Sequence, residues 1–231
     1  MSGLLITATD TECGKTVLTC ALTAYWQEYC APRRLGLLKP VQAGEGDREL
    51  LQRVFQLEQS LEEINPVFFE APLAPPIAAA LEGTTVDLAP AWQRYGALAQ
   101  QCDWVLVEGL GGLGSPVTDE LTVADLAADW RLPVVLVVPV KLGAIANTVA
   151  NVALARQRRL ALQGIVLNCP NPKAEAQLEQ LAPPTLLSRL TRIPVLGVLP
   201  YFSDPTNLAQ LSAAARNLDL EALMPAPFWV A

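Results

Sequence analysis

Short runs of apolar residues recur along the chain, and most of them lack polar alternation. They lie at 4–8, 35–38, 104–107, 133–138, 164–167 and 194–199. The run at 133–138 reads P-V-V-L-V-V. A strand with one solvated face alternates apolar and polar residues, so unbroken runs indicate parallel strands buried on both faces of a sheet.

Between these runs, apolar residues recur at helical spacing. The spacing predicts helices over 16–29 and about 48–57, 91–101, 123–130, 144–160, 174–181 and 208–223. Strands that alternate with helices indicate an α/β domain of three layers. Without a repeat or a low-complexity linker, we expect one domain over 1–231. The Pro-rich stretch 66–76 should be an ordered cover, because Phe68 and Phe69 need burial.

Composition and charge exclude several kinds of chemistry. The 231 residues contain no His, and 23 acidic against 16 basic residues give a net charge of −7. Without His there is no Ser-His-Asp triad, no His general base and no His-ligated zinc. Without a basic run, no nucleic-acid partner is expected. The longest apolar run ends at Lys141, too soon to span a bilayer, so no membrane association is expected either.

The cysteines and the N-terminus predict a cytoplasmic protein. Five cysteines at 13, 20, 30, 102 and 169 form no C-x-x-C pair, and their odd number argues against a disulfide framework. The first residues have no basic region followed by a long apolar stretch, as a signal peptide would.

The segment A-T-D-T-E-C-G-K-T, residues 8–16, connects the first predicted strand to a helix. Gly14, Lys15 and Thr16 match the end of the phosphate-binding pattern G-x-x-x-x-G-K-[ST], whereas Thr9 or Ala8 stands at its first glycine, depending on loop length. A strand, a turn and a helix N-terminus direct backbone N–H groups at an anion. Lys15 can reach the β- and γ-phosphates, and the Thr16 hydroxyl can bind Mg²⁺. We therefore predict nucleotide binding by a P-loop NTPase-like domain with a mostly parallel central sheet and helices on both faces.

More charged residues follow predicted strands. Glu108 ends V-L-V-E-G, an arrangement that holds Mg²⁺ in many NTPases, although a strand can also end on a solvated Glu. Lys39 follows the second strand, and ligands of open parallel sheets bind at such carboxyl ends. Asp47, in A-G-E-G-D, is either a metal ligand or a helix N-cap. Cations and carboxylates around a phosphate loop suit phosphoryl transfer.

These motifs together resemble a known family. T-D-T-E-C-G-K-T, K-P-V-Q-A-G, V-E-G-L-G-G, P-V-V-L-V-V-P-V-K-L-G, G-I-V-L-N and I-P-V-L-G-V-L-P-Y have the order and spacing of dethiobiotin synthetases, from residue 4 to about 220. The resemblance implies a homodimer and a carbon–nitrogen cyclo-ligase of biotin biosynthesis. Its substrates would be 7,8-diaminononanoate, CO₂ and ATP, and its products dethiobiotin, ADP and phosphate. The implied route passes through a carbamate and a carbamic–phosphoric anhydride.

The resemblance also implies the roles of particular residues. Lys39 would be catalytic, with Lys15 and Thr11 beside the carbamate and the γ-phosphate. The implied Mg²⁺ ligands are Thr16, Asp47 and Glu108. The implied nucleotide-binding residues are Glu12, Cys13, Gly14, Lys15, Thr16, Val17, Asp47, Glu108, Gly109, Leu110 and Gly111, with Asn168, Cys169, Pro200, Tyr201 and Phe202 around the base. The implied substrate contacts are Ala43, Gly111, Gly112, Leu142 and Gly143, the last two preceding a helix that would hold the substrate carboxylate across the dimer interface.

Departures from the family pattern keep other functions open. The family usually has Gly at Ala8, Ser or Thr at Ala43, and often Ala at Leu110. One substrate hydrogen bond would then be missing or supplied by Gln42. One alternative is a partition-type ATPase, whose loop carries a Lys near its start, which residues 7–10 lack. Others are an amidating ligase of corrin synthesis, which needs a further domain with Cys and His, and a nucleotide-binding relic without turnover.

Overall fold

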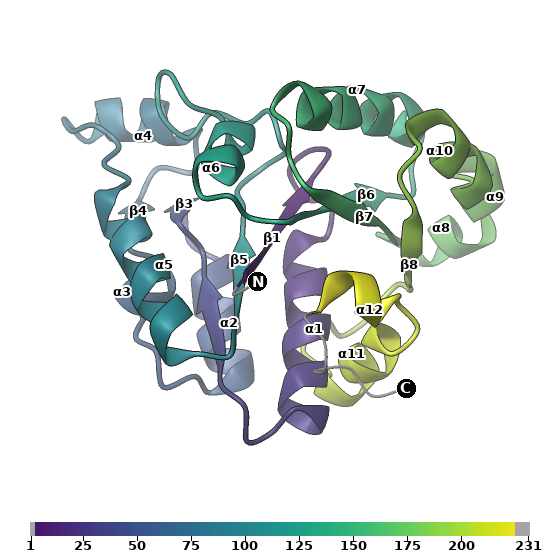
Figure 1. The fold of residues 1–231 in the computed structure, drawn as a ribbon, viewed down its shortest axis with the longest axis horizontal. Coiled ribbons are helices and arrows are strands. Elements are labelled where there is room, and N and C mark those ends of the chain that lie inside the picture. The colour runs from purple at the N-terminus through teal and green to yellow at the C-terminus, as the bar shows by residue number, and fades with distance from the viewer. Residues whose placement is uncertain (1–2, 225–231) are drawn as a thin grey trace.

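A six-stranded, all-parallel sheet forms the centre of the computed structural model, which describes residues 3–224 (Figure 1). Its strand order is β2-β5-β1-β6-β7-β8, and every neighbouring pair is parallel. The strands are β1 (Gly3–Ala8), β2 (Leu35–Leu38), β5 (Trp104–Glu108), β6 (Val134–Pro139), β7 (Leu162–Asn168) and β8 (Val195–Leu199). All six predicted strands are confirmed. Their runs are unbroken because helices cover the sheet on both faces.

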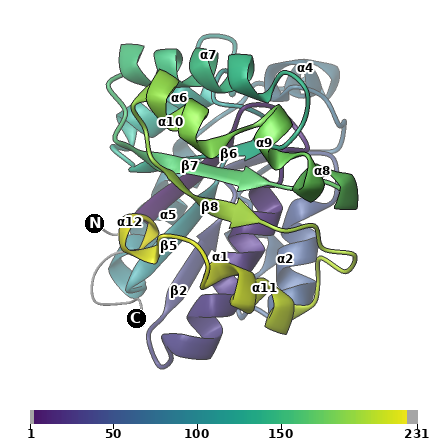
Figure 2. The same ribbon diagram turned by 90° about the vertical axis from the view of Figure 1, so that its right-hand side faces the viewer.

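The helices form the outer layers, which confirms the three-layer prediction. Figure 2 shows α1 (Lys15–Tyr29) and α11 (Leu208–Ala215) on one side of the sheet, and α7 (Ala144–Gln157) and α10 (Pro184–Thr191) on the other. Side chains of alternate strand positions enter separate cores: Leu4 and Ile6 pack towards α1, and Leu5 towards α5 (Ala89–Gln101). The remaining helices are α2 (Asp47–Phe55), α3 (Leu61–Ile64), α4 (Pro75–Leu81), α6 (Val123–Asp129), α8 (Pro172–Ala176), α9 (Leu178–Leu181) and α12 (Leu220–Leu223).

Some predicted helices are shorter than the apolar spacing indicates. The helix predicted over 208–223 is two helices, α11 and α12. Between them, the backbone N–H of Asp219 donates to the Leu196 carbonyl, 2.7 Å away, and the Asp219 carboxylate caps α12 by accepting from Ala222 N. The helix predicted over 174–181 also divides, into α8 and α9 at Gln177. The spacing of apolar residues does not reveal such breaks, because the apolar face continues through them.

The Pro-rich stretch 66–76 contains more regular structure than the ordered cover we predicted. It includes β4 (Val67–Phe69), which pairs in parallel with β3 (Val41–Ala43) in a second, two-stranded sheet, and the start of α4. Phe69 is buried, as expected, whereas Phe68 is half-buried beneath the guanidinium of Arg48. This small sheet lies beside the carboxyl end of β2 and forms one wall of the site.

Membrane-spanning helices and disulfides are both absent from residues 3–224. No helix in this range is long and apolar enough to cross a bilayer. All five cysteines lie in it, and no disulfide joins them.

Candidate functional site

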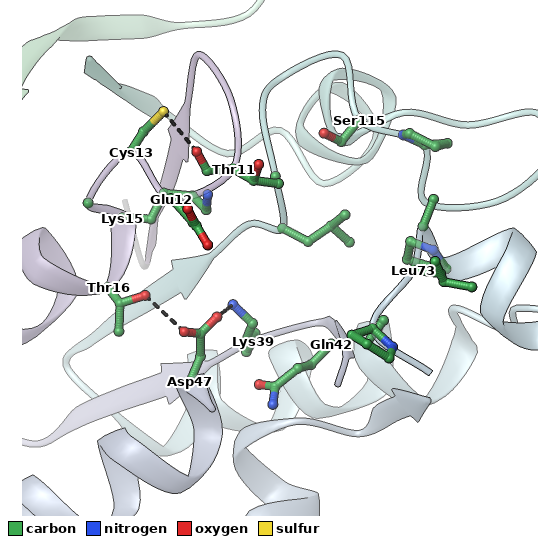
Figure 3. Close-up of a pocket in the computed structure, with 18 residues that line it drawn as sticks. Thr11, Glu12, Cys13, Lys15, Thr16, Lys39, Gln42, Asp47, Leu73 and Ser115 are labelled. Carbon is green, nitrogen blue, oxygen red and sulfur yellow. Dashed lines mark hydrogen bonds and ion pairs between the residues drawn. The ribbon is translucent and has the colours of Figure 1, made fainter. Parts of the chain in front are cut away.

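A cavity of about 570 Å³ opens beyond the carboxyl ends of β1, β2 and β5 (Figure 3). Four segments line it: the loop before α1, the end of β2 with the start of α2, the segment before α4, and the loop after β5. Eleven of the predicted site residues contribute to its lining: Thr11, Glu12, Cys13, Gly14, Lys15, Thr16, Lys39, Ala43, Asp47, Leu110 and Gly111.

The loop after β1 has the backbone geometry expected of a phosphate loop. Gly14 is the N-cap of α1 at a φ of +97°, and Glu12 has a φ of +52°. A Cβ atom at Gly14 would lie 2.3 Å from Nδ2 of Asn168, so both the backbone angle and the space require glycine here. Ala8 ends β1 with its methyl group buried in the core. The departure from glycine at Ala8 therefore adds no side chain to the loop.

The Lys15 side chain folds back over this loop. Its ammonium donates to the Asp10 carbonyl at 3.3 Å, and the side chain is largely buried. Burial lowers the pKa of Lys15, and nearby Glu108 counteracts part of that effect. A lysine desolvated beside free helix N–H groups forms a strong site for phosphate.

Lys39 lies between two carboxylates at the carboxyl end of β2. Its ammonium donates to Oε1 of Glu108 at 2.9 Å and to Oδ2 of Asp47. Burial acts to lower the pKa of Lys39, but the charges of Glu108 and Asp47 outweigh it and raise that pKa. Lys39 also acts to lower the pKa of Asp47, against the effect of burial. The lysine is therefore held as a cation at the floor of the cavity.

Oxygen atoms converge on the Thr16 hydroxyl. It lies 3.1 Å from Oδ1 of Asp47 and 3.0 Å from Oε1 of Glu108, and Thr19 donates to the other Glu108 oxygen at 2.6 Å. Glu108 is 1% exposed, which excludes the solvated strand end. Asp47 is the first residue of α2, after the N-cap Gly46, so the N-cap alternative for Asp47 is wrong. A hydroxyl and two carboxylates are the hard oxygen donors that suit Mg²⁺ with phosphate.

Apart from the polar side chains of Gln42 and Ser115, the rest of the cavity lining is apolar. It contains Ala43, Leu110 and Leu73, together with proline side chains before α4 and Pro116 after β5. The Gln42 carboxamide is occupied, since its Oε1 accepts from Arg48 N at 3.1 Å and its Nε2 donates to Gly44 O at 2.9 Å. Nε2 also donates to Oε2 of Glu49, so Gln42 offers no free donor in place of the hydroxyl that is missing at Ala43.

The residues predicted around the nucleotide base lie at the ends of β7 and β8, outside this cavity. Asn168 is buried against Gly14, and Cys169 donates its N–H to the Leu199 carbonyl. Pro200, Tyr201 and Phe202 follow β8. Tyr201 is 40% exposed, and Phe202 packs against the core that α1 covers.

Other predicted residues also lie outside the cavity. Leu142 is 89% exposed, and Gly143 is the N-cap of α7, with a φ of +88°. Gly112 lies in a neighbouring hollow of about 430 Å³, and a Cβ there would lie 3.0 Å from Thr9 backbone atoms. Gly109 donates its N–H to the Ile6 carbonyl within the sheet, and Val17 packs against the core.

Sequence reasoning missed Thr19, Leu73 and Ser115. Thr19 follows Thr16 by three residues, so helical spacing places both hydroxyls on one face of α1, and this signal could have identified it. Leu73 belongs to the Pro-rich stretch, whose path over the cavity no local pattern indicates. The Ser115 hydroxyl accepts from Gly112 N at 2.8 Å and so fixes the loop after β5.

Comparison with known proteins identifies the family. A family model described as an AAA domain matches residues 2–209. The chain is 58% identical to the ATP-dependent dethiobiotin synthetase BioD of Gloeothece citriformis, covering 97% of this chain and 100% of that protein. This chain belongs to the dethiobiotin synthetase family. The protein of that name from Crocosphaera subtropica is 52% identical over 96% of this chain and 100% of its own length, and that of Bacillus subtilis strain 168 is 31% identical over 97% and 98%.

Solved structures confirm the P-loop NTPase-like fold. A ParA family ATPase from Chlorobium tepidum has a TM-score of 0.60 at 12% identity, covering 96% of this chain and 98% of its own. The septum site-determining protein MinD from Pyrococcus horikoshii, solved with Mg-ADP, has a TM-score of 0.56 at 17% identity, covering 93% and 87%. At such low identity these likenesses establish the fold alone.

Proposed function

We propose that this protein is an ATP-dependent ligase of biotin biosynthesis, a dethiobiotin synthase that closes a ureido ring by carbon–nitrogen bond formation. Its substrates are 7,8-diaminononanoate, CO₂ and ATP. The observation that carries the proposal is that one cavity has two kinds of lining: the cations Lys15 and Lys39 beside the phosphate loop, and the apolar side chains of Ala43, Leu110 and Leu73. Membership of the dethiobiotin synthetase family supports it.

The charged side of the cavity suits phosphoryl transfer. The backbone of residues 12–17 and Lys15 would hold the phosphates. Thr16, Asp47 and Glu108 would hold Mg²⁺, which when bound would offset the negative charge of the phosphates. Lys39, kept cationic by its two carboxylates, and Thr11 would hold the carbamate close to the γ-phosphorus. Catalysis then consists of positioning and charge stabilisation, and no His or covalent nucleophile is required.

The reaction proceeds in three steps. One amine attacks CO₂ and loses a proton to give a carbamate. A carbamate oxygen attacks the γ-phosphorus, and the bond from that phosphorus to the bridging oxygen of ADP breaks. The second amine then attacks the carbonyl of the resulting anhydride, phosphate leaves with the electron pair, and a proton is lost as the ring closes. Holding both amines in one cavity makes this ring closure effectively unimolecular.

The apolar side of the cavity suits the alkyl chain of the substrate. Leu73, Leu110 and Pro116 offer it an apolar surface, and the alkyl chain would displace water from that surface on binding. Ala43 removes a polar group from the same wall. The replacement of a family hydroxyl by Ala43 and of a small side chain by Leu110 thus both increase its apolar character.

The adenine and the substrate carboxylate would lie outside this cavity. Asn168 and Cys169, with Pro200, Tyr201 and Phe202, would surround the base at the ends of β7 and β8. Gly111, Gly112, Leu142 and Gly143 would serve the substrate, the last two from the partner subunit of a homodimer. Leu73 and Ile77, in or just before α4, and Leu142 and Val149, in or just before α7, are exposed apolar side chains, which supports an interface between subunits.

This assignment is tested by the dependence of phosphate release on the diamine. We propose that the protein acts as one domain over 1–231 in the cytoplasm, without nucleic acid or membrane. When purified, it should release phosphate from Mg-ATP and bicarbonate only when 7,8-diaminononanoate is present. Equal release without diamine would favour a P-loop ATPase of the partition type. Bound nucleotide without any release would indicate a relic.

A further inference from the structure

The start of helix α2 has no N-cap side chain to accept from its first N–H groups. Its N-cap is Gly46, at a φ of +141°, which offers no side-chain acceptor to the first N–H groups of the helix. Those groups need partners, and a missing N-cap leaves a helix end free to fray. Asp47, the first residue of this helix, carries a carboxylate that accepts from Lys39 and Thr16. The position of that carboxylate therefore depends on what holds the helix start.

Gln42, on strand β3, supplies the missing cap from outside the helix. Its Oε1 accepts from the backbone N–H of Arg48 at 3.1 Å. Its Nε2 donates to the Gly44 carbonyl at 2.9 Å and to Oε2 of Glu49 at 3.3 Å. The side chain is 3% exposed, and both ends of the carboxamide are bonded. Figure 3 shows Gln42 on the same side of the cavity as Asp47 and Lys39.

Glu49 completes the brace from within the helix. Its Oε2 accepts from the backbone N–H of Gly46 at 2.8 Å, so it reaches back over the turn that contains Asp47. Its other oxygen accepts from Nε of Arg48 at 2.6 Å. The Arg48 guanidinium lies 3.6 Å from the centroid of the Phe68 ring on β4. The small sheet of β3 and β4 thus supports the helix start from two sides.

We propose that Gln42 and Glu49 are positioning residues that hold Asp47 against Lys39 and Thr16 and thereby preset one of the ligands for Mg²⁺. The hydrogen bonds of Gln42 and Glu49 go to Gly44, Gly46 and Arg48 and to each other, so both act through the backbone that carries Asp47. The inference rests on the proposed function only in naming Mg²⁺ and a nucleotide as the ligands of the site. The brace is a property of the ligand-free protein and can be tested without turnover.

The test replaces Gln42 by Met, which keeps the length of the side chain and removes its hydrogen bonds. Binding of Mn²⁺ in the presence of ADP, followed as the loss of the free-ion EPR signal, should weaken about tenfold, the scale on which outer partners of metal ligands act. Amide exchange of residues 47–51 should be faster in the ligand-free variant. The matched control is Gln52→Met, which removes the bond from Gln52 Nε2 to Gln59 O further along α2 and should leave both readouts unchanged.

A second pair of variants separates positioning from a general loss of folding. Glu49→Gln keeps an acceptor for the Gly46 N–H and should restore most of the Mn²⁺ affinity that Glu49→Met loses. In turnover, Glu49→Met, whose side chain does not line the cavity, should raise the Mg²⁺ concentration for half-maximal rate and leave the KM for the diamine unchanged. Wild-type exchange and Mn²⁺ affinity in both Met variants would overturn the proposal. Absence of turnover in the wild type would instead contradict the proposed function, and the exchange measurement would still decide about the brace.

Discussion

The ammonium of Lys39 and Oε1 of Glu108 lie 2.9 Å apart, and both side chains are at least 97% buried. The two residues come from the carboxyl ends of β2 and β5, which are neighbours in the sheet. A buried charge is costly unless a partner of opposite charge compensates it. The topology thus brings together two charges that are 69 residues apart in the chain, and the charge of Glu108 helps to raise the pKa of Lys39.

Replacing Lys39 by Met should lower kcat by roughly a thousandfold, on the scale of losing one group that stabilises transition-state charge. It should also lower the free energy of unfolding by about 3–5 kcal/mol, because Glu108 is left buried without its cation. Steady-state kinetics and urea unfolding measure the two effects. ADP binding close to that of the wild type would show that the variant is folded. A kcat within a few-fold of the wild type would refute the catalytic assignment.

The Thr19 hydroxyl donates a hydrogen bond to the buried carboxylate of Glu108. Thr19→Val keeps the shape of the side chain and removes the 2.6 Å bond to Oε2 of Glu108, so it should lower the free energy of unfolding by about 1–3 kcal/mol. Thr23→Val is the matched control, because the Thr23 hydroxyl bonds to the Thr19 carbonyl of the same helix and not to Glu108. Chemical denaturation of both variants tests this. Equal losses of unfolding free energy in the two variants would show that the bond to Glu108 adds nothing to the stability.

The six strands of the central sheet could be predicted because each is an unbroken apolar run. A strand such as 133–138 is buried on both faces, so its composition alone identifies it. The division of the helix predicted over 208–223 was not predictable, because the bond from Asp219 N to Leu196 O joins residues that no local pattern relates. The strands β3 and β4 have three residues each, too few for a periodicity to be recognised.

The same distinction applies to the site. Lys15, Lys39 and Glu108 were identifiable because each follows a predicted strand, and the carboxyl ends of parallel strands share one edge. The role of Asp47 remained ambiguous in the sequence, because an acidic residue before a helix is often an N-cap, and the shift of the cap to Gly46 depends on backbone angles. The brace from Gln42 was not predictable, since it depends on how the turn 44–46 folds back on β3.

Gly14→Ala should weaken nucleotide binding while leaving the core intact. An alanine is strained at the φ of +97° that Gly14 adopts, and its Cβ would lie 2.3 Å from Nδ2 of Asn168, so the loop would have to distort. Strain of about 1–3 kcal/mol should weaken ADP binding by roughly tenfold to a hundredfold. Isothermal titration measures this.

Gly96→Ala provides the control for that substitution. Gly96 lies within helix α5, and a Cβ there would meet nothing within 4 Å. Alanine should therefore raise the free energy of unfolding by about 0.5–1 kcal/mol without changing ADP binding. Wild-type ADP affinity in Gly14→Ala would contradict the loop geometry described above.

Asp125 gives the stability a dependence on pH. Burial acts to raise the pKa of Asp125, but hydrogen bonds from Thr122 and the charge of Arg158 outweigh it and hold that pKa below 3.8. A lowered folded-state pKa contributes stability that is fully present above the unfolded-state value and is lost as the pH falls through the folded value. Compared with Asp125→Asn, the wild type should be more stable by about 1 kcal/mol at pH 7. This difference in the free energy of unfolding should vanish below the folded-state pKa. Urea unfolding of both proteins at several pH values measures it, and a difference that stays constant with pH would refute the prediction.

The most direct test of the proposed function follows the carbon of CO₂ into the product. The purified protein is incubated with Mg-ATP, 7,8-diaminononanoate and ¹³C-bicarbonate, and the products are separated and weighed by mass spectrometry. We predict dethiobiotin that carries one ¹³C atom, formed in equal amount to the phosphate released, and no such product from Lys39→Met. Phosphate release without labelled dethiobiotin would contradict the account.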